Sequence, residues 1–176
     1  MGMTGRTRKL LGTLIVLAVL GGLGTVLWKR KFDRYTPVEA VLDLQAAAKV
    51  RGSARPVEDF LEARYGPMTV PANRQRAFLD FFNVGHIEGM HVIVSHMQPE
   101  RKQANVQAMA QWLANYRRVM TSEEKAALAA HLRSPSGRAA IQKANVQFLN
   151  KDVHFRAATA PVIQELMTTL ATVQQP

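Results

Sequence analysis

The chain of 176 residues contains no cysteine, and this absence removes several classes of protein. Disulfide scaffolds, thiol catalysis, iron–sulfur clusters and cysteine-ligated zinc sites all need that side chain. The sequence also lacks the alternating pattern of β-strands, internal repeats and low-complexity tracts. Its 47% apolar and 20% charged residues are typical of a folded chain rather than a disordered one. These features predict a folded, all-α protein.

Several catalytic and cofactor motifs are absent as well. There is no Gly-x-Ser-x-Gly elbow, no His-Glu-x-x-His zinc motif and no Cys-x-x-Cys-His for covalent haem. Gly21, Gly22 and Gly24 resemble part of a phosphate loop, but they lie inside an apolar run with no strand before it. We therefore expect no enzymatic activity and no cofactor.

One histidine-rich segment is the only indication of metal chemistry. His86, Glu88, His91 and His96 fall within eleven residues, and Glu88 and His91 would share one helix face. A di-iron bundle needs two such Glu-x-x-His pairs and two further glutamates, and the chain has no second pair. Met90 lies one turn from His86 on the same face, so the two cannot flank a haem iron. We interpret the histidines as surface or helix-capping side chains, and a metal-dependent enzyme is the least favoured hypothesis.

The net charge of +10 is concentrated near the N-terminus. Residues 1–34 carry seven basic side chains and one acidic one, whereas residues 35–176 carry sixteen basic and twelve acidic ones. Nucleic-acid binding requires a denser basic surface than the second segment provides. The charge distribution instead divides the chain into an N-terminal tail, membrane anchor and basic flank (1–34) and an extramembrane helical domain (35–176).

The predicted anchor is the uncharged run of nineteen residues from Leu10 to Trp28. As a helix it would be about 28 Å long, close to the roughly 30 Å thickness of a bilayer's hydrocarbon core. The alternative is a cleaved signal peptide, with Gly22-Leu23-Gly24 as its small-residue site. The length of the run and the basic residues directly after it favour an uncleaved, single-pass transmembrane helix.

Two sets of residues would mediate contacts of this anchor. Small residues at four-residue spacing would let a partner helix approach closely, although glycine is also common in membrane helices; they are Ala18, Gly21, Gly22 and Thr25. Residues expected at the membrane interface, where the basic ones would attract anionic lipid headgroups, are Trp28, Lys29, Arg30, Lys31 and Arg34. Basic residues on the two flanks of the run are nearly balanced, so charge alone does not determine the orientation of the anchor.

Helix signals occupy the rest of the chain and predict a bundle of about six or seven helices. Capping boxes begin at Thr36 and Thr121, and Ser134 followed by Pro135 marks another helix start. A break is expected around residues 83–85, and Pro161 should kink or restart the last helix. The expected inward residues of the first helix are Val38, Val41, Leu42 and Ala48; those of the helix over 100–120 are Val106, Met109, Ala110, Leu113 and Tyr116.

Residues 78–166 resemble a bacterial all-α family of domains of unknown function. The resemblance is carried by Tyr116, by Thr121-Ser122-Glu123-Glu124 and by Ser134-Pro135-Ser136-Gly137. Met120 and Leu132 stand where that family has Phe and Tyr. The resemblance implies an exported or envelope protein, and on this basis we expect the domain on the periplasmic side of a bacterial inner membrane. It supplies no catalytic residues.

These observations lead to two main functional hypotheses. The first is a non-catalytic, membrane-anchored accessory subunit that packs against and stabilises a larger membrane protein complex, with photosynthetic and respiratory assemblies as plausible hosts. The second is a free-standing helical binding module for a lipid or peptide on the periplasmic side. Its groove would be floored by four aromatic side chains, namely Phe78, Phe82, Trp112 and Phe148.

Overall fold

The computed structural model describes residues 37–174, which form eight α-helices and no strand. The all-α prediction is confirmed for this part of the chain. The predicted anchor, its small residues Ala18, Gly21, Gly22 and Thr25, and its interface residues Trp28 to Arg34 lie outside the described residues. The helices are α2 (Val38–Lys49), α3 (Pro56–Tyr65), α4 (Pro71–Asp80), α5 (Val84–Ser95), α6 (Pro99–Val119), α7 (Ser122–Arg133), α8 (Pro135–Leu149) and α9 (Val153–Gln174).

Helix starts follow the local signals in the sequence. Proline occupies the first turn of α3, α4, α6 and α8, where its missing N–H would have no partner within the helix. Thr121 and Glu124 form the predicted capping box at α7, and the Ser134 hydroxyl accepts a hydrogen bond from the Gly137 amide at α8. Asn83 caps α5, which confirms the expected break. These backbone starts were therefore predictable from the sequence.

The first described helix departs from the expectation. The predicted capping residue Thr36 lies outside the described residues; the N-cap of α2 is Pro37, without a side-chain cap, and Glu39 pairs with Arg64. The predicted stripe of Val38, Val41, Leu42 and Ala48 is not the buried face: Val38 is 73% exposed. The buried positions are Ala40, Asp43 and Ala46. Hydropathy alone placed the wrong face inward, because the buried face of α2 carries a charged group with partners on other helices.

The last helix also differs from the prediction. The chain breaks after Leu149, and α9 then runs through Pro161 without a new start. The reason for the earlier break is Asp152, whose carboxylate accepts a hydrogen bond from the Phe155 amide at 2.9 Å and so caps α9. This boundary gives eight described helices instead of the six or seven expected.

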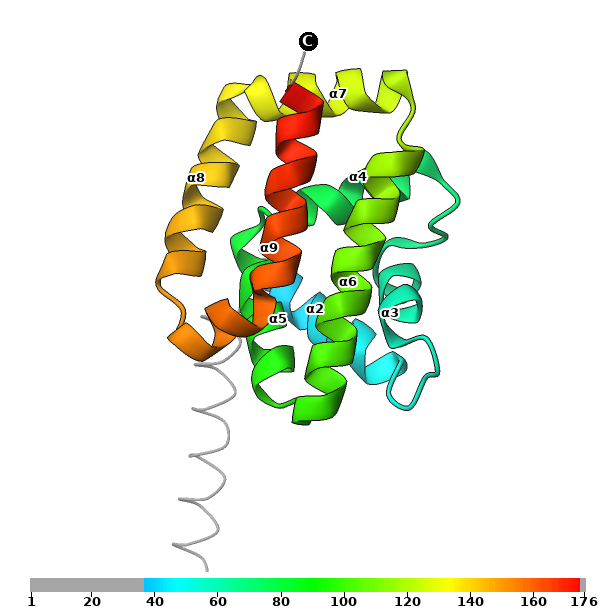
Figure 1. The fold of residues 1–176 in the computed structure, drawn as a ribbon, viewed down its shortest axis with the longest axis vertical. Coiled ribbons are helices and arrows are strands. Elements are labelled where there is room, and N and C mark those ends of the chain that lie inside the picture. Colours follow the sequence, from blue (N-terminus) through cyan, green and yellow to red (C-terminus); the bar gives the residue numbers. More distant parts are fainter. Residues whose placement is uncertain (1–36, 175–176) are drawn as a thin grey trace, which may run out of the picture. The chain divides into compact units, whose positions relative to one another are not determined.

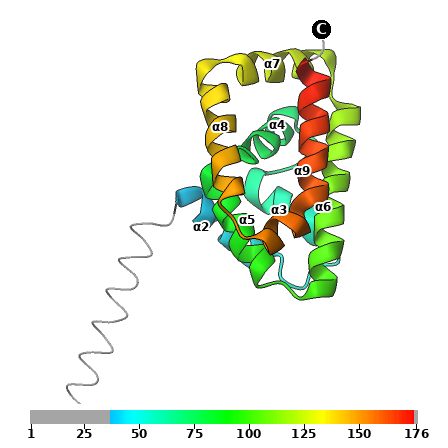
Figure 2. The same ribbon diagram turned by 60° about the vertical axis from the view of Figure 1, so that its left-hand side comes forward.

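The helices pack in an arrangement that leaves α8 set apart from the centre (Figures 1 and 2). Helices α6 and α9 lie side by side and run in the same direction, while α7 lies across their upper ends in Figure 1. Helix α8 returns from α7 and packs on α7 and α5. Helix α2 packs on α5 and α3. A pocket described below lies in the space bordered by α5, α6, α8 and α9.

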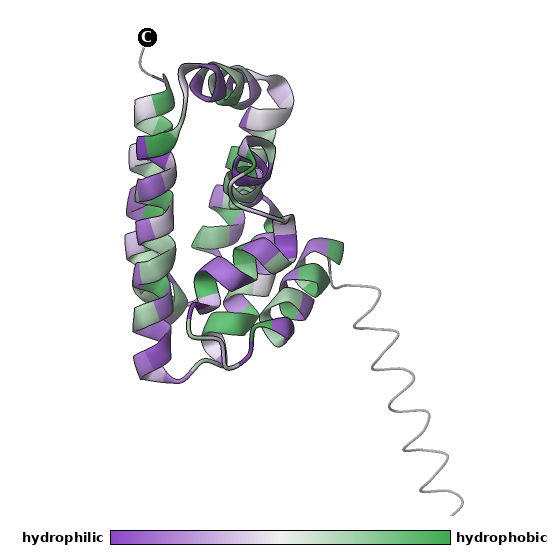
Figure 3. Ribbon diagram, turned by 90° about the vertical axis from the view of Figure 1, so that its right-hand side faces the viewer, coloured by the Kyte–Doolittle hydropathy of each residue, from purple (hydrophilic) through white to green (hydrophobic). Residues whose placement is uncertain are grey.

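The core is apolar and contains the face of α6 that the sequence predicts, with all five expected residues buried. The helices carry both hydrophilic and hydrophobic residues (Figure 3). Accordingly, none of the helices described between residues 37 and 174 is long and apolar enough to cross a membrane. Core residues with 2% exposure or less include Leu61, Ala77, Phe78, Leu113, Tyr116 and Leu128.

Close packing of α2 on α5 depends on two glycines of α5. A Cβ atom built on Gly89 would lie 2.8 Å from the Asp43 Cβ, and one on Gly85 would lie 2.8 Å from the Glu39 Cβ. Larger residues would therefore push α2 away from α5. The same approach brings the carboxylate of Asp43 to His86, the first contact of the candidate site.

Candidate functional site

A buried group of charged side chains joins α2, α3, α4 and α5. The guanidinium of Arg64, 4% exposed, contacts three carboxylates. Its Nε donates to Asp43 Oδ1 at 3.1 Å, its Nη2 lies 3.4 Å from Asp80 Oδ2, and Glu39 is its third partner. Arg64 therefore neutralises charges from two other helices, and burial makes that compensation necessary.

His86 extends this charged group towards the centre of the domain. Its side chain is 3% exposed, and Nδ1 lies 2.7 Å from Asp43 Oδ2, although the atoms lack the alignment of a regular hydrogen bond. The interpretation of His86 as a surface or capping residue is wrong, because the close approach of α2 buries it. Burial raises the pKa of Asp43, and the hydrogen bond and positive charge that His86 can offer oppose that rise. Asp43 thus depends on His86 as well as Arg64.

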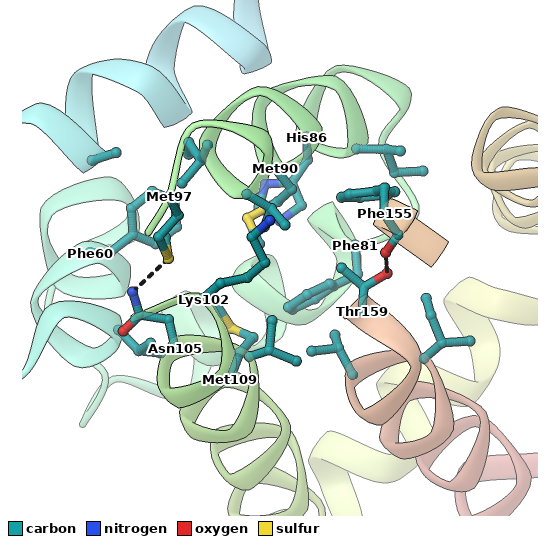
Figure 4. Close-up of a pocket in the computed structure, with 18 of the residues that line it drawn as sticks. Phe60, Phe81, His86, Met90, Met97, Lys102, Asn105, Met109, Phe155 and Thr159 are labelled. Atoms are coloured by element: carbon teal, nitrogen blue, oxygen red, sulfur yellow. Dashed lines mark hydrogen bonds between the residues drawn. The ribbon is translucent and has the colours of Figure 1, made fainter. Parts of the chain in front are cut away.

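A large apolar pocket begins on the other side of His86 (Figure 4). Its volume is about 610 Å³, within the roughly 300–1,000 Å³ range of small-molecule sites. Helices α5, α6, α8 and α9 supply most of its wall. The side chains that give it an apolar character are four methionines and five phenylalanines; they are Met90, Met97, Met109, Met167, Phe60, Phe81, Phe82, Phe148 and Phe155.

The four aromatic residues predicted to floor a groove divide between two places. Phe82 and Phe148 line the pocket. Phe78 is fully buried and packs edge-on against Phe82, whereas Trp112 stacks on Tyr116; neither lines the pocket. The pocket methionines Met90, Met97 and Met109 were not predicted from the sequence as site residues. Their spacing resembles that of any core-facing helix, so no local signal separated pocket from core.

Polar atoms are few in the pocket. Asn105 donates a hydrogen bond from Nδ2 to the Met97 sulfur at 3.1 Å, and the Thr159 hydroxyl donates to the Phe155 carbonyl oxygen at 2.8 Å. His86 Nε2 is buried and lacks a hydrogen-bond partner among the described residues. Lys102 extends from α6 towards Met90 and His86 (Figure 4). His86 of α5 and Lys102 of α6 therefore bring two polar groups to the same part of the pocket.

The other members of the histidine-rich segment do not converge on one point. Glu88 accepts hydrogen bonds from Gln147 and from Lys151, the latter at 2.6 Å. His91 Nε2 lies 3.0 Å from Asp152 Oδ2, and His96 Nδ1 lies 2.9 Å from the Val92 carbonyl oxygen. Between residues 37 and 174, no three side chains form a metal-binding group. Glu88 and His91 instead connect α5 to the turn between α8 and α9.

Asp152 gives this turn a pH dependence. Hydrogen bonds from the Phe155 amide and from His91 lower the pKa of Asp152 to about 2. Because the folded-state pKa is depressed, the stabilisation is complete above the unfolded value of 3.8 and is lost as pH falls towards 2. We expect Asp152→Ala to lower thermal stability at pH 6, with the difference from wild type shrinking as pH falls from 4 to 2. Thermal melts across this range check it, and a pH-independent difference would contradict it.

Comparisons of the chain with protein-family models, with curated proteins and with solved structures found no match. The resemblance of residues 78–166 to a bacterial helical family therefore stays a prediction. The geometry of the pocket and of the charged group beside it is the basis on which a function is proposed.

Proposed function

We propose that the helical domain is a binding module that holds a hydrophobic small molecule in the pocket between α5, α6, α8 and α9. The observation that carries this proposal is an apolar pocket of about 610 Å³. Native interiors are close-packed, and voids larger than a water molecule are few. A concave site of this volume, lined by Met and Phe with few polar groups, has the features of a ligand site.

The composition of the wall supports a flexible, chain-like ligand over a rigid one. Methionine is unbranched and has three rotatable side-chain bonds, so its side chain adapts to irregular shapes. Met90 and Met109 come from the two helices that also bear His86 and Lys102, and Met97 lies in the turn between these helices. An alkyl chain can follow such a surface and bury its methylene groups, each contributing about 0.8 kcal/mol.

The predicted anchor would place this module where such molecules are found. In this proposal Leu10 to Trp28 spans a bacterial inner membrane, Lys29 to Arg34 contact anionic headgroups, and the domain lies on the periplasmic side. The module needs no catalytic residue, because its chemistry is burial of apolar surface. Lipid is favoured over peptide since the polar wall groups are too few to pair with the hydrogen-bonding groups of a peptide backbone.

A photoreactive alkyl probe tests the binding module. The full chain in phospholipid nanodiscs would be exposed to a hexadecanol analogue with a mid-chain diazirine, and labelled peptides would be identified by mass spectrometry. We expect labelling of pocket residues on α5 and α6, with unlabelled hexadecanol competing. Ala144→Phe should reduce that labelling about tenfold, because Ala144 is buried in the wall and a larger side chain would fill the pocket.

Ala127→Phe, an exposed position on α7, is the matched control and should label like wild type. Helical content by circular dichroism verifies that both variants fold. Labelling confined to residues outside the pocket, or equal in Ala144→Phe and wild type, would contradict the proposal.

The accessory-subunit hypothesis is a second proposal, and the uncharged run with its small residues at positions 18, 21, 22 and 25 favours it. In that case the span would pack against helices of other membrane-protein subunits. A mild-detergent pull-down separates the two proposals. Stoichiometric protein partners would favour the accessory subunit, whereas a chain that carries an extractable lipophilic molecule would favour the binding module.

A further inference from the structure

The charged side chains that line the pocket all carry one sign. They are Arg51, Arg101 and Lys102, and neither aspartate nor glutamate lines it. Acidic side chains are not scarce in this part of the chain, because residues 35–176 contain twelve of them beside sixteen basic ones. The carboxylate of Asp43, which contacts the pocket residue His86, is also paired with Arg64. A ligand in the pocket therefore meets only cationic charge on the wall.

Lys102 brings one of these charges inward. Its side chain is half-buried, and its stem crosses the pocket with the ammonium group towards Met90 and His86 (Figure 4). A lysine at such a position ordinarily keeps its charge in water by extending outward. Within residues 37–174 Lys102 has neither an ion pair nor a side-chain hydrogen bond, unlike Lys151, which pairs with Glu88. A half-buried ammonium among apolar groups calls for a counter-charge.

His86 adds a second unsatisfied group on the same side of the pocket. It is 2% exposed, its Nδ1 faces Asp43, and its buried Nε2 has no partner among the described residues. Leaving a buried polar atom without a hydrogen bond costs about 1–3 kcal/mol. A polar group at the end of a ligand chain would pair with Nε2 while its charge pairs with Lys102.

We propose that the pocket binds a long-chain carboxylic acid, with the carboxylate at Lys102 and His86 and the alkyl chain among the methionines and phenylalanines. This inference rests on the proposed binding function and names the ligand class. One chain rather than two is inferred because 610 Å³ corresponds to a single drug-sized ligand. A carboxylate has two acceptor oxygens, one for the Lys102 ammonium group and one for His86 Nε2.

The test compares two probes that differ only at the end of the chain. The full chain in nanodiscs is photolabelled at about pH 8, where a carboxylic acid is ionised, with the diazirine hexadecanoic acid and with the matching alcohol. We expect the acid to label pocket residues of α5 and α6 at least about tenfold more efficiently, the value of a hydrogen bond to a charged group. Lys102→Met should remove this preference and leave labelling by the alcohol within about twofold of wild type.

Two variants control for charge and for fold. Lys125→Met removes an exposed lysine of α7 outside the pocket and should retain the preference for the acid. Lys102→Arg should restore most of it, since the positive charge is kept. Circular dichroism of each variant verifies the fold. We expect Lys102→Met to fold, because the methionine side chain is similar in length to the aliphatic stem of the lysine that it replaces.

The outcomes separate the two proposals. Equal pocket labelling by acid and alcohol, or a preference that survives Lys102→Met, overturns the carboxylic-acid inference and leaves the apolar binding function intact. Absence of pocket labelling by either probe overturns both. If the preference for the acid is lost in Lys125→Met as well as in Lys102→Met, the preference depends on the overall charge of the domain. That result would contradict the role of Lys102.

Discussion

Arg64→Leu is expected to destabilise the domain by about 3–5 kcal/mol, the usual cost of removing one partner from a buried ion pair. Arg64 is 4% exposed and contacts Glu39, Asp43 and Asp80. The leucine would leave Asp43, which is fully buried, with His86 as its remaining partner. Typical domains are stable by only 5–15 kcal/mol, so a large part of the folded population would be lost. Urea unfolding followed by circular dichroism measures the change.

An exposed ion pair provides the control for this prediction. Arg55 lies 3.7 Å from Asp59, and its side chain is 73% exposed. Arg55→Leu should change the free energy of unfolding by less than about 1 kcal/mol. Similar losses in the two variants would mean that the contacts of Arg64 do not depend on burial, contrary to our expectation.

Acidification should reduce the loss caused by Arg64→Leu. Burial already raises the pKa of Asp43 above 3.8 in the wild-type domain, and removal of the guanidinium raises it further. A carboxyl group with a raised folded-state pKa favours folding below its unfolded pKa, and this contribution is lost as pH rises through the folded value. The difference between variant and wild type should therefore be smaller at pH 4 than at pH 7. A larger difference at pH 4 would argue against a buried carboxylate as the cause.

Gly137→Ala is expected to destabilise the domain by about 2–3 kcal/mol, although alanine normally stabilises a helix by up to about 1 kcal/mol relative to glycine. The reason is the tight turn between α7 and α8. A Cβ atom at Gly137 would lie 2.2 Å from the His131 carbonyl oxygen and 3.0 Å from the Leu132 Cα. Both are backbone atoms, so the helices must separate to admit the methyl group. Thermal or urea unfolding of Gly137→Ala and wild type measures whether the substitution lowers or raises the free energy of unfolding.

Ser136→Ala is the matched control, because it changes an exposed neighbour in the same turn. Its effect should stay within about 0.5 kcal/mol. Since α8 supplies Phe148 and Ala144 to the pocket, displacement of α8 in Gly137→Ala should also weaken labelling of the pocket by alkyl probes. A stabilised Gly137→Ala variant would show that the α7–α8 turn is more open than described.

The polar link between α5 and the α8–α9 turn explains why the histidine-rich segment resembles a metal site in sequence. Glu88 and His91 share a helix face, as a Glu-x-x-His pair does, but each has its own partner: Lys151 for Glu88 and Asp152 for His91. The pair thus has a structural use that needs no metal. The spacing of Glu88 and His91 along α5 does not distinguish a metal site from a pair of links to another helix, because both arrangements need the two side chains on one face of α5.

Much of the helical framework was determined by the sequence itself. The caps at Thr121 and Ser134, the break near Asn83 and the inward face of α6 were all predictable. The physical reason is that a helix start depends on backbone amides and side chains within three or four residues, and a strong apolar stripe points inward wherever the helix packs. The same local reasoning explains the capped start of α9 at Asp152 once the break is known.

The burial and pairing of the charged side chains and the existence of the pocket depend on the tertiary structure. Arg64 meets Asp43 across 21 residues, and His86 meets the same carboxylate across an even longer stretch of chain. Whether a charged residue is buried with partners depends on how closely helices approach, which at α2 and α5 is set by Gly85 and Gly89. The pocket likewise exists because α8 packs on α7 and α5 away from α6. Helical periodicity determines which side chains share a face, but only the packing of several helices determines whether that face meets another side chain or borders a pocket.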